Sequence, residues 1–313
     1  REEPAMIFFT HTGPIPLYLT AAILQAQTVS PNQHIILLTD QAKNPVPQTL
    51  RATMDIAKIE DYFDSAAAFA EIFRFEGRNS YEYELWNFQR WFVIEEYARV
   101  NKVEEPLLHL DSDAFLYIGP ASVIPALSAD LSVCDVSGPQ FVFMKSRHSL
   151  HRYTTFISDH FSTDEGFQQL QDYVSKSNLS GLPHVSDMVS LGLFGETNEV
   201  EDIGSPSRSD FQFCENIGSS QGLRMGLLGK KMRVRNGVPS FVRLDGSLIP
   251  AGGVHLQGGN KALWPFFASF ALQLQIVRHF PRGYANAISD ALRKALLAMS
   301  LRLARLARKI LAR

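Results

Sequence analysis

Two aspartates that stand one residue apart directly follow a short apolar segment. Residues 106–110 read Pro-Leu-Leu-His-Leu, and Asp111, Ser112 and Asp113 come next. Side chains alternate along a strand, so an extended chain places both carboxylates on the same side. Two hard oxygen ligands suit Mg²⁺ or Mn²⁺, and such a cation suits a diphosphate. A solvated turn is the alternative, and the apolar strand before the pair favours the metal site.

A second group of polar residues lies between His255 and Lys261. A neutral imidazole at His255 can complete a metal site begun by two carboxylates. Gly258 and Gly259 let the backbone approach a phosphate closely, and Lys261 offers that phosphate a positive charge. An ordinary glycine-rich surface loop is the alternative for this segment taken alone.

Together the two segments resemble a known group of enzymes. A D-x-D triplet after a strand, followed about 140 residues later by H-x-x-G-x-x-K, resembles the retaining glycosyltransferases of GT-A fold. This group includes glycogenin and bacterial lipopolysaccharide glucosyl- and galactosyltransferases. The resemblance implies that Asp111, Asp113 and His255 hold Mn²⁺ (or Mg²⁺) on the diphosphate of a nucleotide-sugar donor. It also implies that Lys261 contacts the leaving phosphate, with Ser112 and Gly258 in the donor site.

One arginine of a predicted helix, Arg90, lies before the D-x-D strand. The resembled enzymes carry an arginine on that helix which reaches the donor sugar or its phosphates. Arg90 is therefore expected to bind the donor and to assist departure of the diphosphate. The alternative is a surface arginine whose stem covers Trp86 and Trp91.

The end of the first predicted strand offers groups for a nucleoside. In the resembled fold, this loop holds the base and the ribose. Thr10 and His11 are expected to hydrogen-bond uracil or ribose, and Asp40 is expected to accept from the base edge or a ribose hydroxyl. Loop capping and an ordinary aspartate at a strand end are the alternatives.

The segment 184–188 is a candidate for the acceptor side. Asp187 is expected to orient an acceptor hydroxyl or to stabilise oxocarbenium-like charge. A helix N-cap at Ser186 or Asp187 is the alternative. Asn216 is a weaker candidate for the same side.

The elements that must position these residues alternate along the chain. Apolar runs predict strands at 6–10, 35–39 and 107–111, and helical spacing predicts helices at 16–28 and 81–100. Further strands are expected at 131–136 and 141–144, a helix at 163–176, and a hairpin from 231–235 and 240–244. Residues 178–259 otherwise look loop-rich. The prediction is an α/β fold of GT-A type, a Rossmann-like mixed sheet with flanking helices.

Composition limits the class of protein. The 313 residues are 45% hydrophobic and 20% charged, as in soluble globular proteins. The two cysteines, Cys134 and Cys214, do not make a disulfide framework and favour a reduced, cytoplasmic setting. No apolar run reaches the length of a transmembrane helix, and no signal peptide is recognised. No nucleic-acid partner is expected.

The last part of the chain differs from the rest. We expect a glycosyltransferase domain at 1–280 and a basic amphipathic helix at 281–313. The second segment contains eight basic residues and one acidic residue. Packing on the protein's own body or forming a coiled coil are alternatives. The positive excess favours an anionic membrane surface bound through 284–313, and so a peripheral location on the inner face of the cytoplasmic membrane.

The predicted function is transfer of a hexose from a nucleoside-diphosphate sugar, most simply UDP-linked, to a glycan or lipid-linked saccharide. One alternative is a catalytically silent, membrane-associated protein that binds nucleotide-sugars. Another is a nucleotidyltransferase of related fold. That class would carry a basic, glycine-rich loop after the first strand, whereas the loop at 12–14 is short and has no basic residue.

Overall fold

A computed structural model describes most of the chain. The described residues are 5–41, 54–134, 138–176, 184–198, 200–220, 222–226, 229–235, 238–268 and 282–294. Their contacts separate into two compact units. Unit 1 contains residues 1–14, 32–111 and 120–203, and unit 2 contains residues 15–31, 112–119 and 204–313.

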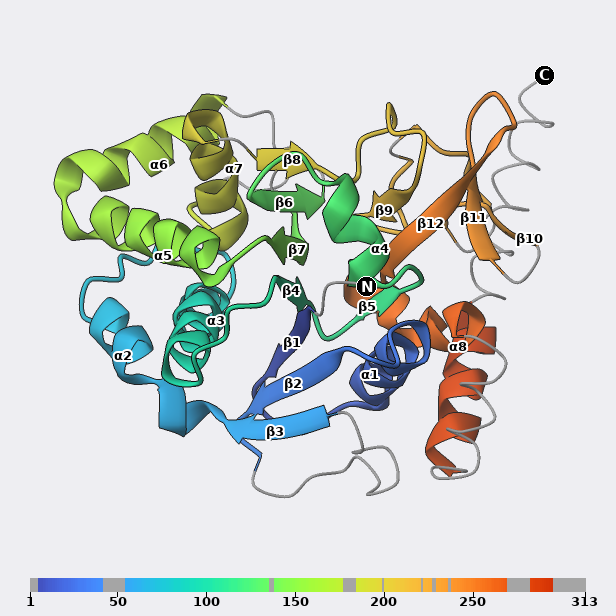
Figure 1. The fold of residues 1–313 in the computed structure, drawn as a ribbon, viewed down its shortest axis with the longest axis horizontal. Helices are drawn as coiled ribbons and strands as arrows, with labels where there is room; N and C mark the ends of the chain where they lie inside the picture. Colours follow the sequence, from blue (N-terminus) through green and yellow to red (C-terminus); the bar gives the residue numbers. More distant parts are fainter. Residues whose placement is uncertain are drawn as a thin grey trace, which may run out of the picture. The chain divides into compact units, whose positions relative to one another are not determined.

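Unit 1 is built on a seven-stranded mixed sheet of order β3-β2-β1-β4-β7-β6-β8 (Figure 1). Its strands are β1 (Met6–His11), β2 (His34–Thr39), β3 (Met54–Lys58), β4 (Leu107–Leu110), β6 (Leu131–Cys134), β7 (Gly138–Met144) and β8 (Val200–Asp202). The four strands from β3 to β4 are parallel, whereas β7 is antiparallel to both of its neighbours. The carboxyl ends of β1, β2 and β4 therefore meet at one edge of the sheet, where ligands of such sheets bind.

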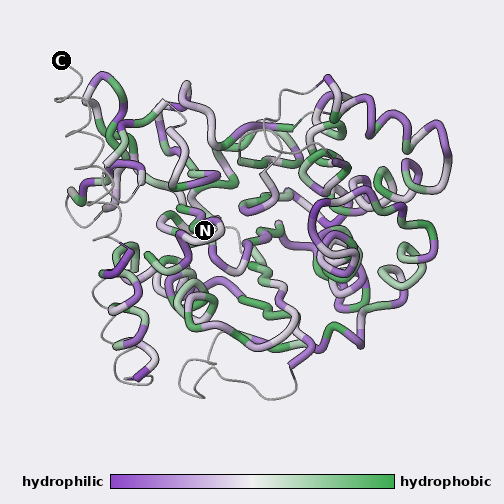
Figure 2. The backbone as a smooth tube through the Cα atoms, turned by 180° about the vertical axis from the view of Figure 1, so that it is seen from behind, coloured by the Kyte–Doolittle hydropathy of each residue, from purple (hydrophilic) through white to green (hydrophobic). Residues whose placement is uncertain are grey.

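Helices cover this sheet and close the core of unit 1. They are α2 (Asp64–Ala70), α3 (Tyr81–Val100), α4 (Pro120–Val123), α5 (Arg147–Ser162), α6 (Asp164–Lys176) and α7 (Asp187–Thr197), with 3₁₀ turns η2 (Ile59–Tyr62) and η3 (Ile124–Ala126). The core joins apolar side chains of the strands to those of α2, α3, α5, α6 and α7. Figure 2 shows the corresponding pattern, with hydrophobic residues along the central strands and alternating character around the outer helices.

Unit 2 contains a smaller sheet. Its strands run in the order β10-β11-β12-β5, and β9 pairs with β12 off that path. They are β5 (Ala114–Leu116), β9 (Gln212–Cys214), β10 (Met232–Arg235), β11 (Val238–Val242) and β12 (Leu248–His255), accompanied by α1 (Leu17–Val29), η4 (Gly258–Leu263) and α8 (Trp264–Phe267). Residues 282–294 form a further helix.

The predicted class, an α/β protein with a mixed sheet and flanking helices, is confirmed by this architecture. The helix predicted at 81–100 is confirmed as α3, with the same first and last residues. Ser80 defines its start, because the Ser80 side chain accepts a hydrogen bond from the Tyr83 amide (3.3 Å). The hairpin is also present, although Arg235 pairs with Val238 and Pro239 lies within β11.

The expectation of a loop-rich region at 178–259 was incomplete. Its described part contains α7 and the five strands from β8 to β12. These strands are only three to eight residues long, and short strands among glycine and proline give a weak periodic signal.

Only part of the predicted C-terminal helix can be described. Residues 282–294 are helical, whereas the expected domain boundary at 280 and the segment 295–313 lie outside the described residues. Within the part of the chain that the structure describes, no helix combines the length and apolarity needed to span a membrane.

Candidate active site

Strand pairing in unit 2 brings His255 to Asp113. β12 runs antiparallel to β5, with His255 opposite Ala114, and the Leu256 amide donates to the Asp113 carbonyl (3.1 Å). His255 Nε2 then lies 3.2 Å from Asp113 Oδ1. Because the register of the two strands sets this approach, the two predicted metal ligands converge without help from a flexible loop.

The other ring nitrogen fixes the orientation of His255. Nδ1 lies 2.5 Å from the backbone carbonyl of Glu215. A carbonyl oxygen only accepts, so Nδ1 carries the hydrogen, and in the neutral imidazole Nε2 keeps the lone pair that a metal ligand needs. Histidine ligands of metals are commonly held in this way by a second hydrogen bond.

The third group at this position is Lys261, in η4. Its Nζ lies 3.3 Å from Asp113 Oδ2 and 5.2 Å from the centroid of the Tyr18 ring on α1. Asp113 is only 4% exposed, so both of its oxygens are engaged in a largely dry site. Gly258, the first residue of η4, has φ +58°, a conformation that favours glycine.

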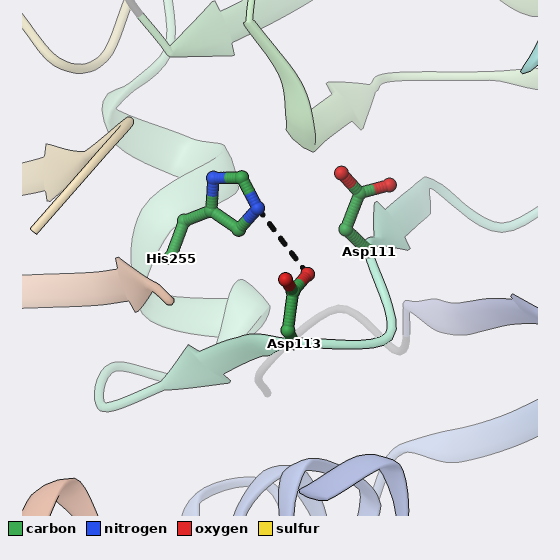
Figure 3. Close-up of side chains that lie close together, drawn as sticks. All are labelled: Asp111, Asp113 and His255. Carbon is green, nitrogen blue, oxygen red and sulfur yellow. Dashed lines mark ion pairs between the residues drawn. The ribbon is translucent and has the colours of Figure 1, made fainter. Parts of the chain in front are cut away.

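Asp111 is joined to this group by a single intervening residue, Ser112. It follows β4 directly, and its amide donates to the Gln140 carbonyl (3.1 Å). One ligand atom from each of Asp111, Asp113 and His255 lies within 4.8 Å of the others. Figure 3 shows His255 facing Asp113, with Asp111 beside them.

This donor set fits a hard divalent cation. In an octahedral site with ligands at about 2.1 Å, neighbouring ligand atoms lie about 3 Å apart and opposite ones about 4.2 Å apart. The 3.2 Å between His255 Nε2 and Asp113 Oδ1 matches two neighbouring ligands. Two carboxylates and one imidazole are compatible with Mn²⁺ or Mg²⁺.

In unit 1, Arg90 of α3 binds Asp111. Arg90 Nη1 donates to Asp111 Oδ1 (2.6 Å), and Nη2 donates to Asp187 Oδ2 (2.5 Å). Burial alone would lower the pKa of Arg90, but the two carboxylates outweigh it and raise the pKa above its ordinary value. Arg90 therefore holds Asp111 in place as a permanently charged partner. Its predicted direct contact with the donor stays a prediction.

Asp187 lies at the start of α7, where Ser186 is the N-cap and accepts from the Val189 amide (3.4 Å). The N-cap alternative for this segment is thus realised at Ser186. Asp187 is 4% exposed, and burial raises the pKa of its carboxyl although Arg90 lowers it. Its observed partner is Arg90, and its predicted role toward an acceptor remains untested.

The residues predicted to hold the nucleoside all lie at the carboxyl ends of β1 and β2. Thr10 is buried near the end of β1, and His11 Nε2 lies 3.1 Å from the Pro14 carbonyl. The exposed Asp40 accepts from the Gly13 amide through both carboxylate oxygens (2.9 and 3.0 Å). Asp40 thus closes the loop after β1, and binding roles for these residues stay predictions.

Sequence reasoning missed Glu84, a second buried acid on α3. Glu84 Oε1 lies 3.3 Å from His184 Nε2, with 2% and 7% of the two side chains exposed. The Asn79 side chain also donates to Glu84 (2.5 Å). His184 lies three residues before Asp187, so this pair anchors the chain just before α7. Nothing local in the sequence marks Glu84, because it looks like a polar residue in a helix's first turn.

The candidate for the acceptor side in unit 2, Asn216, has internal partners. Its Nδ2 donates to Gln257 Oε1 (2.5 Å), and its Oδ1 accepts from the Gly218 amide (2.8 Å). It ties the segment after β9 to the start of η4, and a contact with an acceptor is a prediction that no observation tests.

No family model and no curated protein matches this chain. Several solved structures are similar to it. They include mouse xyloside xylosyltransferase 1 (11% identity, TM-score 0.46, 66% of this chain and 87% of that one) and an active-site mutant of LgtC (13%, 0.38, 81% and 87%). The glycosyltransferase GlyE of Streptococcus pneumoniae is similar over 63% of this chain and 44% of its own, at 14% identity and a TM-score of 0.35.

These structures are glycosyltransferases, the class that the D-x-D and H-x-x-G-x-x-K motifs resemble. Among these three, identities are at most 14% and TM-scores at most 0.46. Such low similarity does not transfer the ligands or the activity of those proteins, so the function of this chain must be argued from its own residues.

Proposed function

We propose that this protein is a metal-dependent glycosyltransferase that uses a nucleoside-diphosphate sugar. The observation that carries the proposal is the surroundings of Asp113. One carboxylate oxygen faces an imidazole whose tautomer is fixed, and the other faces the ammonium of Lys261. A cation site beside a lysine in a glycine-rich loop suits a diphosphate.

Asp111, Asp113 and His255 are the residues that would hold the cation. When bound, it supplies positive charge that neutralises a diphosphate as the bond to the sugar breaks. Lys261 moves from Asp113 toward the leaving phosphate and adds charge there. Arg90 keeps the Asp111 carboxylate oriented.

We propose UDP as the nucleotide and a hexose as the sugar. Thr10, His11 and Asp40 lie at the carboxyl ends of strands, where nucleotides bind in α/β sheets. Ser112 lies between the two aspartates and Gly258 lies three residues after His255. Both are proposed to contact the diphosphate, because a short side chain, or none, lets the backbone come close to a phosphate. The glycine at 258 is needed for its backbone conformation.

The acceptor hydroxyl is proposed to enter on the side of Asp187. With retention of configuration, the leaving phosphate takes the proton of that hydroxyl, and no separate protein base is required. We propose a glycan or a lipid-linked saccharide as the acceptor. The basic C-terminal segment, which suits an anionic membrane surface, supports the lipid-linked kind.

Release of UDP tests the proposal. The protein is incubated with Mn²⁺ and a panel of UDP-sugars, with and without a saccharide acceptor mixture, and UDP is measured. Donor hydrolysis or transfer is expected for one sugar in the wild type and not in Asp113→Asn. Donor binding without UDP release would favour the silent binding protein. Release of pyrophosphate from a nucleoside triphosphate and a sugar phosphate would favour the nucleotidyltransferase.

A further inference from the structure

The helix at 282–294 packs on the segment that follows the H-x-x-G-x-x-K motif. Ala291 of this helix is fully buried. The ring of Tyr284 meets that of Trp264 edge-on, with centroids 5.9 Å apart. These contacts lie within unit 2, so this helix is docked beside the glycine-rich loop rather than hanging free of it.

Docking brings a second ammonium group to that loop. A methyl group built on Gly259 would lie 3.0 Å from Lys294 Nζ. The missing side chain of Gly259 thus leaves the space that the ammonium occupies. Lys261, two residues further on, carries the ammonium that contacts Asp113. The loop therefore carries one ammonium of its own, on Lys261, and is contacted by a second one from another element.

Lys294 differs from Lys261 in its surroundings. Its side chain is half-buried, and burial lowers the pKa of its ammonium. Among the described residues, no ion pair to Lys294 is found, whereas Lys261 shares Asp113. A partly desolvated cation without an anion is unfavourable. Its position suits an anion that arrives with a ligand.

We propose that Lys294 binds the diphosphate of the nucleotide donor, as a second lysine beside Lys261. This inference rests on the proposed function and extends the donor site to the C-terminal helix. A phosphate group is the shared chemistry of a nucleoside diphosphate and a lipid headgroup. The nucleotide is the source we choose, because Lys294 Nζ lies against the loop that contains Lys261.

Binding of UDP in the presence of Mn²⁺, measured by calorimetry on the full chain, tests this role. Lys294→Gln is expected to weaken UDP binding about tenfold, as for loss of one charge-assisted hydrogen bond. Lys294→Arg keeps the charge and is expected to retain most of the affinity. Uridine, which has no phosphate, is expected to bind both variants and wild type equally.

The matched control is Arg293→Gln, an exposed neighbour on the same helix. It removes the same charge from the same segment and is expected to leave UDP affinity unchanged. Binding to vesicles that contain phosphatidylglycerol is measured in parallel. Equal loss of UDP affinity in both variants, or an unchanged affinity in a folded Lys294→Gln, overturns the inference.

Two other outcomes separate the possibilities. If Lys294→Gln loses vesicle binding far more than Arg293→Gln while UDP affinity is unchanged, the lysine serves a lipid headgroup and the inference is wrong. A wild-type protein that binds no nucleoside diphosphate refutes the proposed function, and the role of Lys294 with it.

Discussion

The Nδ1 nitrogen of His255 and the carbonyl oxygen of Glu215 lie 2.5 Å apart. Glu215 directly follows β9, and β9 pairs with β12, which ends at His255. The pairing of two strands therefore decides which nitrogen of the imidazole faces Asp113. A ring held in this way needs no rearrangement to accept a cation.

Replacing His255 by alanine is expected to abolish metal binding while the fold persists. Even loss of an outer hydrogen bond to a metal ligand lowers metal affinity about 10–100-fold, so loss of the ligand itself should exceed that range. Thermal unfolding with increasing Mn²⁺ measures the effect, because binding to the native state alone raises apparent stability.

His34→Ala is the control for this change, since His34 is an exposed histidine paired with the exposed Asp55. It should leave the Mn²⁺-dependent rise in melting temperature intact. An equal rise in His255→Ala and wild type would show that the cation binds elsewhere.

Breaking the buried pair of Arg90 and Asp187 should cost much more stability than breaking a surface ion pair. Both side chains are over 90% buried, and removing one partner of a buried pair typically costs about 3–5 kcal/mol. Arg90→Leu should lower the free energy of unfolding by nearly that amount, because it leaves the Asp187 carboxylate buried without its partner and removes a partner of Asp111. Asp187→Asn should cost less, because Arg90 keeps Asp111.

Urea unfolding of the two single variants and the double variant measures this coupling. The double variant is expected to lose less stability than the two single losses added together. Arg74→Leu is the control, because its partner Asp164 is 98% exposed, and it should change stability little. Strict additivity at Arg90 and Asp187 would contradict a direct interaction.

The chemistry of the site could be predicted from sequence where it depended on single elements. The D-x-D pair follows an apolar strand, and α3 is framed by a serine cap at Ser80 and an end at Asn101. Helix α5 was not predicted, although Leu150, Tyr153, Ile157 and Phe161 recur at helical spacing and are all buried. That signal was present in the sequence.

Relationships between distant residues could not be predicted in the same way. Arg90 and Asp187 are 97 positions apart, and only the packed structure shows that the arginine binds two carboxylates. Lys294 and Gly259 are a similar case, because no periodic pattern in the sequence indicates which loop a helix packs against. Sequence supplied the kinds of side chain, and tertiary packing decided their partners.

Gly252, three residues before His255 on β12, is expected to tolerate no side chain. A methyl group there would lie 2.4 Å from Cε2 of Phe213, and that ring is fully buried and cannot move into solvent. Gly252→Ala should destabilise the protein by about 1–3 kcal/mol through overpacking, and should weaken the Mn²⁺ response by shifting β12.

Gly258→Ala provides the comparison for that variant. No atom lies within 4 Å of a methyl group at Gly258, but its φ of +58° is unfavourable for alanine. The cost there should be about 1–2 kcal/mol from backbone strain alone. The double variant Gly252→Ala with Phe213→Leu should recover stability if the clash is the cause, and an unrecovered loss would contradict this explanation.

Stability at alkaline pH should depend on Tyr97. Burial, with smaller contributions from Tyr62 and Asp55, raises the pKa of Tyr97 from 10 to about 12. Between these values the unfolded chain loses the phenolic proton and the native protein keeps it. The stabilising contribution is therefore complete below pH 10 and is lost as pH rises through 12, at no more than about 1.4 kcal/mol per pH unit.

Urea unfolding at pH 9, 10 and 11 measures this dependence. Tyr97→Phe should flatten the fall in stability above pH 10 relative to wild type, because phenylalanine has no proton to lose. Tyr83→Phe is the comparison. Burial also raises the pKa of Tyr83, but the residue is 56% exposed, so the slope should change less than in Tyr97→Phe. Identical slopes for wild type and Tyr97→Phe would mean that this hydroxyl ionises equally in the folded and unfolded states.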